Sequence, residues 1–338
     1  MRVLITGATG FLGRHLCARL ARFGHRITAY HRPGSRTDGI RGLGVELVAG
    51  ELHDAGRLSV ACRNQDLVIH AAADIRGWAA DPAAQVRTNV DGSRVAARTC
   101  LSSGVGRLIH VSSVSAVGIP GDDKPADEGF EFNLRGPRFA YHISKKRAET
   151  AVLETVRKGL DAVIVNPASI FGPMAQPSGQ GNGPGYRGSE ILRKGAGQRI
   201  VPIFAGGRCI AHVEDVVDGI LAAIQSGRTG ERYILGGDNV SFRDIAEHSS
   251  RARNERTTLV TLPAWSSELL APFAAGVRRC RGALPGCAVH HADGRFQYYC
   301  SDKAITELGY SPRSFEAILE ECLGLKPKAV WAGGKISV

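Results

Sequence analysis

The stretch that decides the fold follows Met1 and is Arg2-Val3-Leu4-Ile5-Thr6-Gly7-Ala8-Thr9-Gly10-Phe11-Leu12-Gly13. The apolar first half predicts a buried β-strand, and three glycines spaced G-x-x-G-x-x-G predict a tight turn into a helix. Gly7 and Gly10 let the backbone approach a ligand without an intervening Cβ, and Gly13 lets the helix pack closely on the strand. Because the first amides of such a helix bind phosphate, the stretch predicts a dinucleotide site.

A glycine triplet alone is a weak signal in a chain with 42 glycines. Its alternative interpretation is a tight strand-to-helix turn that holds no ligand. The apolar strand before the glycines and the amphipathic segment after them favour dinucleotide binding.

The composition is that of an ordinary globular protein. The 338 residues are 43% hydrophobic and 22% charged, enough to bury a large core in one large or two ordinary domains. No uncharged apolar run approaches the roughly 18 residues of a membrane span, and the first strand leaves no room for a signal peptide. We therefore expect a cytoplasmic protein without membrane contact.

Cysteines and charge exclude two further classes of function. The eight cysteines form no Cys-x-x-Cys pair, so we expect reduced thiols. Cys280, Cys287, His290, His291 and Cys300 lie close in sequence, but their spacing matches no usual zinc pattern, and we expect no metal. The net charge of +11 is spread along the chain without a basic tail. We attribute it to a phosphate-bearing cofactor and a solvated surface, and expect no nucleic-acid binding.

Strand and helix patterns alternate through the first half of the chain. Further strands are predicted near 26–30, 45–49, 67–71 and 107–112, and this alternation is typical of a parallel sheet covered on both faces. The predicted fold is α/β, a Rossmann-type doubly wound parallel sheet with a smaller, mostly helical C-terminal substrate domain. The expected cofactor domain is 1–173 with 205–237 returning to it, and the substrate domain is 174–204 with 238–338. Helices are expected at 241–253, 263–281, 301–308 and 313–324.

The residues after the second strand indicate which dinucleotide binds. An acidic side chain there would accept hydrogen bonds from the adenosine ribose, but none is present. Instead the chain has His31, Arg32, Ser35 and Arg36, and Arg32 is suited to stack on adenine and pair with a 2′-phosphate. The pattern favours NADP over NAD; the alternative is a basic surface loop.

Candidate catalytic residues follow the fifth strand. Ser112 and Ser113 stand where the carboxyl edge of the sheet is expected, which is where such folds bind ligands. Tyr141 and Lys145 are four apart on one helix face. A nearby ammonium favours phenolate, so Tyr141 is suited to pass a proton while Ser113 holds the substrate oxygen. The alternative is a surface helix whose Tyr–Lys pair has no role.

These motifs together resemble the extended short-chain dehydrogenases/reductases, the NAD-dependent epimerase/dehydratase family. The pattern is most similar to dihydroflavonol-reductase-like and hopanoid-associated sugar epimerase-like members. The matching segments cover nearly the whole chain and are 6–13, 51–52, 70–72, 89–92, 112–113, 141–145, 166–173, 212–216, 301–304 and 308–312.

The resemblance implies that Ser113, Tyr141 and Lys145 are catalytic and that Lys145 also holds the nicotinamide ribose. Two positions depart from the family pattern: Glu51 stands where an aspartate is usual, and His31-Arg32 replaces the acid that selects NAD. The implied cofactor contacts are Gly7, Thr9, Gly10, Phe11, Leu12, Gly13, His31, Arg32, Ser35, Arg36, Glu51, Leu52, Ala71, Ala72, Ala73, Asn89, Ser112, Tyr141, Lys145, Asn166, Pro167 and Ser169. The expected substrate contacts are Ser113, Ile75, Trp78 and Arg187.

Three functions fit these residues. The first is an NADPH-dependent reductase of a small-molecule ketone or aldehyde, or the reverse dehydrogenase. The second is a sugar-nucleotide epimerase with tightly bound cofactor, in which Arg187, Arg193, Lys194 and Arg208 would grip the diphosphate. The third is a non-catalytic NADP-binding protein. A homodimer through 83–103 and 138–156 is implied by the resemblance, and 174–190 is expected to form a mobile lid.

Overall fold

The computed structural model describes residues 1–75, 81–174, 186–188, 200–262 and 295–325. Its centre is a seven-stranded sheet in the order β11-β6-β5-β4-β1-β2-β3, and every pairing in it is parallel. The strands are β1 (Arg2–Thr6), β2 (Arg26–His31), β3 (Glu46–Ala49), β4 (Leu67–His70), β5 (Arg107–Val111), β6 (Ala162–Pro167) and β11 (Arg232–Leu235). The predicted Rossmann-type α/β fold is confirmed.

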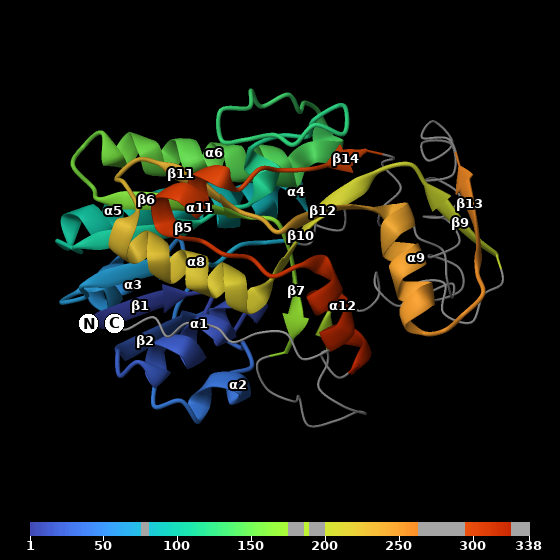
Figure 1. Cartoon of the computed structure of the whole chain (residues 1–338). Coiled ribbons are helices and arrows are strands. Elements are labelled where there is room, and N and C mark those ends of the chain that lie inside the picture. Colours follow the sequence, from blue (N-terminus) through green and yellow to red (C-terminus); the bar gives the residue numbers. More distant parts are fainter. Residues whose placement is uncertain (76–80, 175–185, 189–199, 263–294, 326–338) are drawn as a thin grey trace.

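Helices cover both faces of this sheet (Figure 1). One face packs against α1 (Phe11–Arg22), α2 (Asp38–Arg41), α8 (Val213–Ser226) and α11 (Asp302–Leu308). The other packs against α3 (Ala55–Cys62), α5 (Gly92–Ser102) and α6 (Ala140–Val156). Each buried strand is apolar on both faces because both are covered.

The helical segment that leads into α5 is irregular. It starts as α4 (Pro82–Gln85), becomes a π-helix over Val86–Asp91 and continues as α5. The segment is therefore one continuous run of helix from Pro82 to Ser102 in which one stretch is widened. Single π turns inside α-helices occur often at functional sites, and this one contains Asn89.

A second layer of structure lies beside the main sheet. Its five-stranded sheet contains β7 (Ser169–Pro173), β8 (Tyr186–Arg187), β10 (Gly207–His212), β12 (Asp238–Ser241) and β14 (Phe296–Gln297). A two-stranded sheet pairs β9 (Ile200–Phe204) with β13 (Thr258–Leu262). The helices α9 (Phe242–Ala252) and α12 (Phe315–Leu323) pack beside them, and Figure 1 shows α9 next to β9 and β13.

The smaller part is less helical than the sequence patterns indicated. Strands of two to six residues are too short to show a clear period of two, and for this reason the periodicity missed them. The helix expected at 263–281 lies outside the described residues. The expected helices at 241–253, 301–308 and 313–324 are present as α9, α11 and α12.

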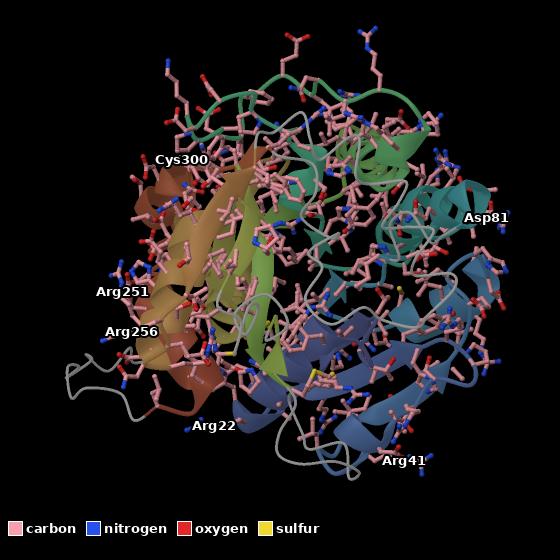
Figure 2. All side chains as sticks on the ribbon, turned by 90° about the vertical axis from the view of Figure 1, so that its right-hand side faces the viewer. Arg22, Arg41, Asp81, Arg251, Arg256 and Cys300 are labelled. Atoms are coloured by element: carbon pink, nitrogen blue, oxygen red, sulfur yellow. The ribbon has the colours of Figure 1, made fainter. Side chains whose placement is uncertain are left out.

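The surface and the core have the expected chemistry. Figure 2 shows Arg251 and Arg256 close together at the left edge of the molecule, with Arg22 and Arg41 at separate places along its lower edge. The described cysteines are free, and five of these six are buried. Within the described residues no helix has both the length and the apolarity that a membrane crossing requires.

Val152 lies in 138–156, one of the two segments expected at a homodimer interface. It is fully buried against the sheet of its own chain, so it is not available to a partner subunit.

The close packing of α1 on the glycine turn gives the first prediction. A Cβ on Gly13 would lie 2.2 Å from the Gly7 carbonyl oxygen and 2.8 Å from the Ala8 Cα. We expect Gly13→Ala to lower the free energy of unfolding by about 3 kcal/mol, because both obstacles are backbone atoms. Urea unfolding measures this change.

The matched control is Gly42→Ala at the end of α2, where a Cβ meets no atom within 4 Å and φ is −73°. Its unfolding free energy should stay within about 0.5 kcal/mol of the parent value. Equal effects of the two substitutions would contradict the close packing at Gly13.

Candidate active site

The glycine turn forms a narrow cradle at the carboxyl edge of the sheet. Gly7 has a φ of +71°, and the Gly10 amide donates a hydrogen bond to the Gly7 carbonyl at 2.9 Å. A Cβ on Gly7 would lie 2.7 Å from the Ala72 nitrogen, so the turn and the end of β4 nearly touch. The cradle is thus built from backbone, and its open amides at the start of α1 fit a pyrophosphate.

The second strand ends in the basic loop that the sequence singled out. Arg32 is exposed and makes no ion pair among the described residues, whereas Arg36 pairs with Asp38 at 3.5 Å. Ser35 is half-buried, and its amide donates to the Arg32 carbonyl at 3.1 Å. Of the two arginines in this loop, Arg32 is therefore the one whose guanidinium has no carboxylate partner among the described residues.

Glu51 and Leu52 line the next loop. The Tyr30 hydroxyl donates to the Glu51 carbonyl at 3.0 Å and fixes the start of this loop. Gly50 is required there, since a Cβ would lie 2.1 Å from the Tyr30 hydroxyl oxygen. These contacts hold the Glu51 backbone beside the end of β2 and β3.

Ser113 and Tyr141 meet at the edge of β5. Ser113 follows the strand in extended conformation and its Oγ accepts from the Ser115 amide at 3.2 Å. Burial raises the pKa of Tyr141 to about 12 and the Asp74 carboxylate adds to the rise, whereas a hydrogen bond with Ser113 and the charge of Arg187 oppose it. Tyr141 is therefore a protonated phenol at neutral pH. From the sequence, Lys145 was expected to supply the opposing charge, but in the structure Arg187 supplies it.

Lys145 lies on the same helix, below Tyr141. Its Nζ donates to the Val111 carbonyl at 3.0 Å, at the last residue of β5, and the side chain is 3% exposed. Burial lowers the pKa of Lys145 to about 8, and the Glu149 carboxylate limits the fall. The ammonium is thus held at the point where strand β5 leads into Ser113.

Asn89 is buried and fully hydrogen-bonded to protein groups. Its Oδ1 accepts from the Asp74 amide at 2.7 Å, and its Nδ2 donates to the Asp74 carbonyl at 3.1 Å and to Ser144 Oγ at 2.9 Å. Ser144 Oγ donates to the Tyr141 carbonyl at 2.7 Å. Asn89 therefore ties the loop after β4 to the first turn of α6, which carries Tyr141.

Two buried polar atoms at this edge have no hydrogen-bond partner among the described residues. They are Ser112 Oγ and Asn166 Oδ1, and both belong to residues predicted to contact the cofactor. Asn166 is followed by Pro167, which ends β6, and by Ser169 on β7. Unpaired buried polar atoms are costly, so a ligand amide or hydroxyl that bonds to them fits this edge.

The residues predicted to contact substrate differ in how they lie relative to Tyr141 and in their exposure. Arg187 stacks over the Phe11 ring at 5.1 Å from its centroid, and its charge acts on Tyr141. Ile75 is 55% exposed on the loop after β4. Trp78, Arg193 and Lys194 lie outside the described residues. Arg208 is half-buried on β10.

Two carboxylates of the site were not predicted from the sequence. Asp74 is 9% exposed and acts on Tyr141, and Glu149 is 1% exposed and acts on Lys145. Glu149 continues the four-residue spacing of Tyr141 and Lys145 on the same helix face, which is a signal that was available in the sequence.

Comparisons with known proteins agree with this architecture. Residues 3–236 match the sequence model of the NAD dependent epimerase/dehydratase family. The chain is 31% identical over 326 residues to the putative dihydroflavonol 4-reductase of Synechocystis sp. (strain ATCC 27184 / PCC 6803 / Kazusa), over 94% of this chain and 92% of that protein. It is 31% identical over 247 residues to sterol demethylase protein B of Methylococcus capsulatus, over 73% of each chain.

A solved structure extends the likeness to three dimensions. The crystal structure of gox2253 is 33% identical, has a TM-score of 0.77, and the likeness covers 95% of this chain and 96% of that chain. The resemblance that the motifs indicated is thus confirmed at the level of fold and family. The chain therefore belongs to the NAD dependent epimerase/dehydratase family, and it is an NAD(P)-dependent enzyme of the oxidoreductase and epimerase type.

Proposed function

We propose that this protein is an NADPH-dependent reductase of a ketone or aldehyde. The observation that carries the proposal is the hydrogen-bonded pair Ser113–Tyr141 at the carboxyl edge of β5, with the Lys145 ammonium on the same helix. In this arrangement a carbonyl oxygen that reaches Ser113 and Tyr141 has a hydroxyl donor on each side. The third hypothesis, a non-catalytic binding protein, would require loss of these groups.

The chain's own residues supply binding and the proton. The glycine cradle and the edge formed by Ser112 and Asn166 would hold the dinucleotide, which supplies a hydride when bound. Ser113 orients the substrate oxygen, and Tyr141 donates its phenolic proton to that oxygen as negative charge develops there. The raised pKa of Tyr141 keeps this proton in place at neutral pH, which is the protonation state that carbonyl reduction requires.

The substrate class is supported by the relatives. The Synechocystis protein is named for a dihydroflavonol reductase and the Methylococcus protein for sterol demethylation. Neither name refers to a sugar nucleotide, so we place a carbonyl compound ahead of a nucleotide sugar. The alternative is a sugar-nucleotide epimerase, which uses the same three residues and returns the hydride to its substrate.

The choice of NADP rests on the loop after β2. Arg32 is exposed directly after β2 and has no described carboxylate partner, and the loop carries no acidic residue before Asp38. A guanidinium can donate two hydrogen bonds to the oxygens of a phosphate, and its positive charge attracts the negative charge of that group. We therefore infer that Arg32 binds the adenosine 2′-phosphate.

The second prediction tests catalysis. Tyr141→Phe should lower NADPH-linked reduction at least about 1,000-fold, since it removes the proton donor, and should leave the Kd for NADPH within about threefold. A panel of carbonyl compounds, followed by NADPH absorbance, measures the rate with the substrate that the parent enzyme reduces fastest.

The matched control is Tyr310→Phe, a buried tyrosine whose hydroxyl has no hydrogen-bond partner among the described residues. It should retain the parent rate. An active Tyr141→Phe enzyme would contradict the assignment of Tyr141 as the proton donor. The alternative function would be supported by a parent protein that purifies with tightly bound NAD and epimerises a sugar nucleotide with no net oxidation or reduction of this cofactor.

The third prediction tests the cofactor. Arg32→Ala should weaken NADPH binding roughly 10- to 100-fold more than NADH binding, because both cofactors lose the stacking on adenine but only NADPH loses the charge-assisted hydrogen bond to its 2′-phosphate. Isothermal titration calorimetry measures both affinities. Arg22→Ala, an exposed arginine at the end of α1, is the control and should change neither. If the parent protein binds NADH as tightly as NADPH, the inference about NADP is wrong.

A further inference from the structure

Glu149 is a buried carboxylate on α6 that the proposed reaction does not use. Its side chain is 2% exposed, and it lies one turn beyond Lys145 on the same helix. Glu149 Oε1 accepts from Asn166 Nδ2 at 2.6 Å, and Oε2 accepts from Arg232 Nη1 at 3.2 Å. Both oxygens are therefore satisfied, and the carboxylate is held away from water.

The partners of Glu149 connect it to the catalytic edge from two sides. Asn166 Nδ2 also donates to the Ser113 carbonyl at 2.9 Å, so the amide joins Glu149 to the backbone of a catalytic residue. Arg232 comes from β11, and its other nitrogen donates to the Glu128 carbonyl. The result is a buried chain from Arg232 through Glu149 and Asn166 to Ser113.

The surroundings of Lys145 make a buried negative charge important. His70 on β4 and His110 on β5 face the ammonium, and burial keeps the pKa of both imidazoles low, so they are neutral. Tyr141 is a protonated phenol. Lys146 and Arg232 are the cations near Glu149. Besides the Val111 carbonyl, which accepts from the Lys145 Nζ, the described charge that favours the charged form of Lys145 is therefore that of Glu149.

We propose that Glu149 is a positioning residue that keeps Lys145 protonated at neutral pH and anchors the Ser113 backbone through Asn166. The proposal deepens the proposed function, because it rests on Lys145 serving the reaction as an ammonium. In a low-dielectric interior an opposite charge one helical turn away has a large effect on the proton affinity of an amine. A neutral residue at 149 leaves the amine buried without compensation.

The fourth prediction is tested by an NMR titration of the full-length protein that carries ¹³C at the lysine Cε atoms. The chemical shift of Cε changes when the amine loses its proton, so the pH midpoint of the Lys145 signal reports its proton affinity without a reagent that must reach the buried amine. We expect a midpoint near pH 8 in the parent, from the pKa of Lys145. Glu149→Gln keeps an oxygen for Asn166 but removes the charge, and should lower the midpoint by about one pH unit.

Two further variants keep the test decisive. Glu149→Gln leaves Arg232 as an unpaired, largely buried cation, so Glu149→Gln/Arg232→Gln removes both charges and should fold if the single variant does not. It should also lower the midpoint. Glu154→Gln, an exposed glutamate on the same helix, is the control and should leave the midpoint unchanged.

The outcomes separate this inference from the proposed function. An unchanged Lys145 midpoint in both Glu149 variants would overturn the role of Glu149, whatever the enzyme reduces. A lowered midpoint in a protein that reduces no carbonyl compound would leave the role of Glu149 in place and contradict the reductase. If the role of Glu149 and the reductase activity are both correct, the alkaline limb of the pH–rate profile should lie at lower pH in Glu149→Gln than in the parent. The shift should equal the shift of the Lys145 midpoint.

Discussion

The site depends on one constraint, a positive charge buried at the carboxyl edge of a parallel sheet. Both faces of the sheet are covered by helices, so an ammonium there loses its hydration and must find partners in the protein. Lys145 finds the Val111 carbonyl at 3.0 Å and the field of Glu149. The polar groups on this face are arranged around that requirement.

A chain of hydrogen bonds between neutral groups runs beside the charge of Lys145. Ser93 Oγ donates to the Asn89 carbonyl at 2.6 Å, so His70 Nε2 must donate to Ser93 Oγ at 3.2 Å. His70 Nδ1 is then the acceptor for the Thr6 hydroxyl at 2.8 Å, which defines a neutral tautomer. A second cation next to Lys145 is thereby avoided, and β1, β4 and α5 are joined beneath the glycine turn.

Features that arise from local chemistry were predictable from the sequence. Glycines that admit close backbone approach, strands buried on both faces, and residues four apart on one helix face all leave local patterns, and so the fold, the glycine turn and the Ser113–Tyr141 pair were predictable. The π turn that contains Asn89 was not, and the hydrogen bonds of the Asn89 side chain to Asp74 and Ser144 join segments that lie apart in the sequence. Asp74 was missed for the same reason, because its importance comes from the groups that surround it after folding. Glu149 was missed although its four-residue spacing after Lys145 is visible in the sequence.

In the proposed reduction, the two proton affinities at the site give Tyr141 and Lys145 different roles. The pKa of Tyr141 is raised to about 12 and that of Lys145 is lowered to about 8, so below pH 8 both carry their protons. A rise in pH removes the proton of Lys145 long before that of Tyr141. For the proposed reduction, we therefore expect that loss of activity at alkaline pH reports neutralisation of Lys145, while Tyr141 still carries its proton. Because burial lowers the pKa of Lys145 to about 8, close to neutral pH, the proposed role of Glu149 is to keep this amine charged there.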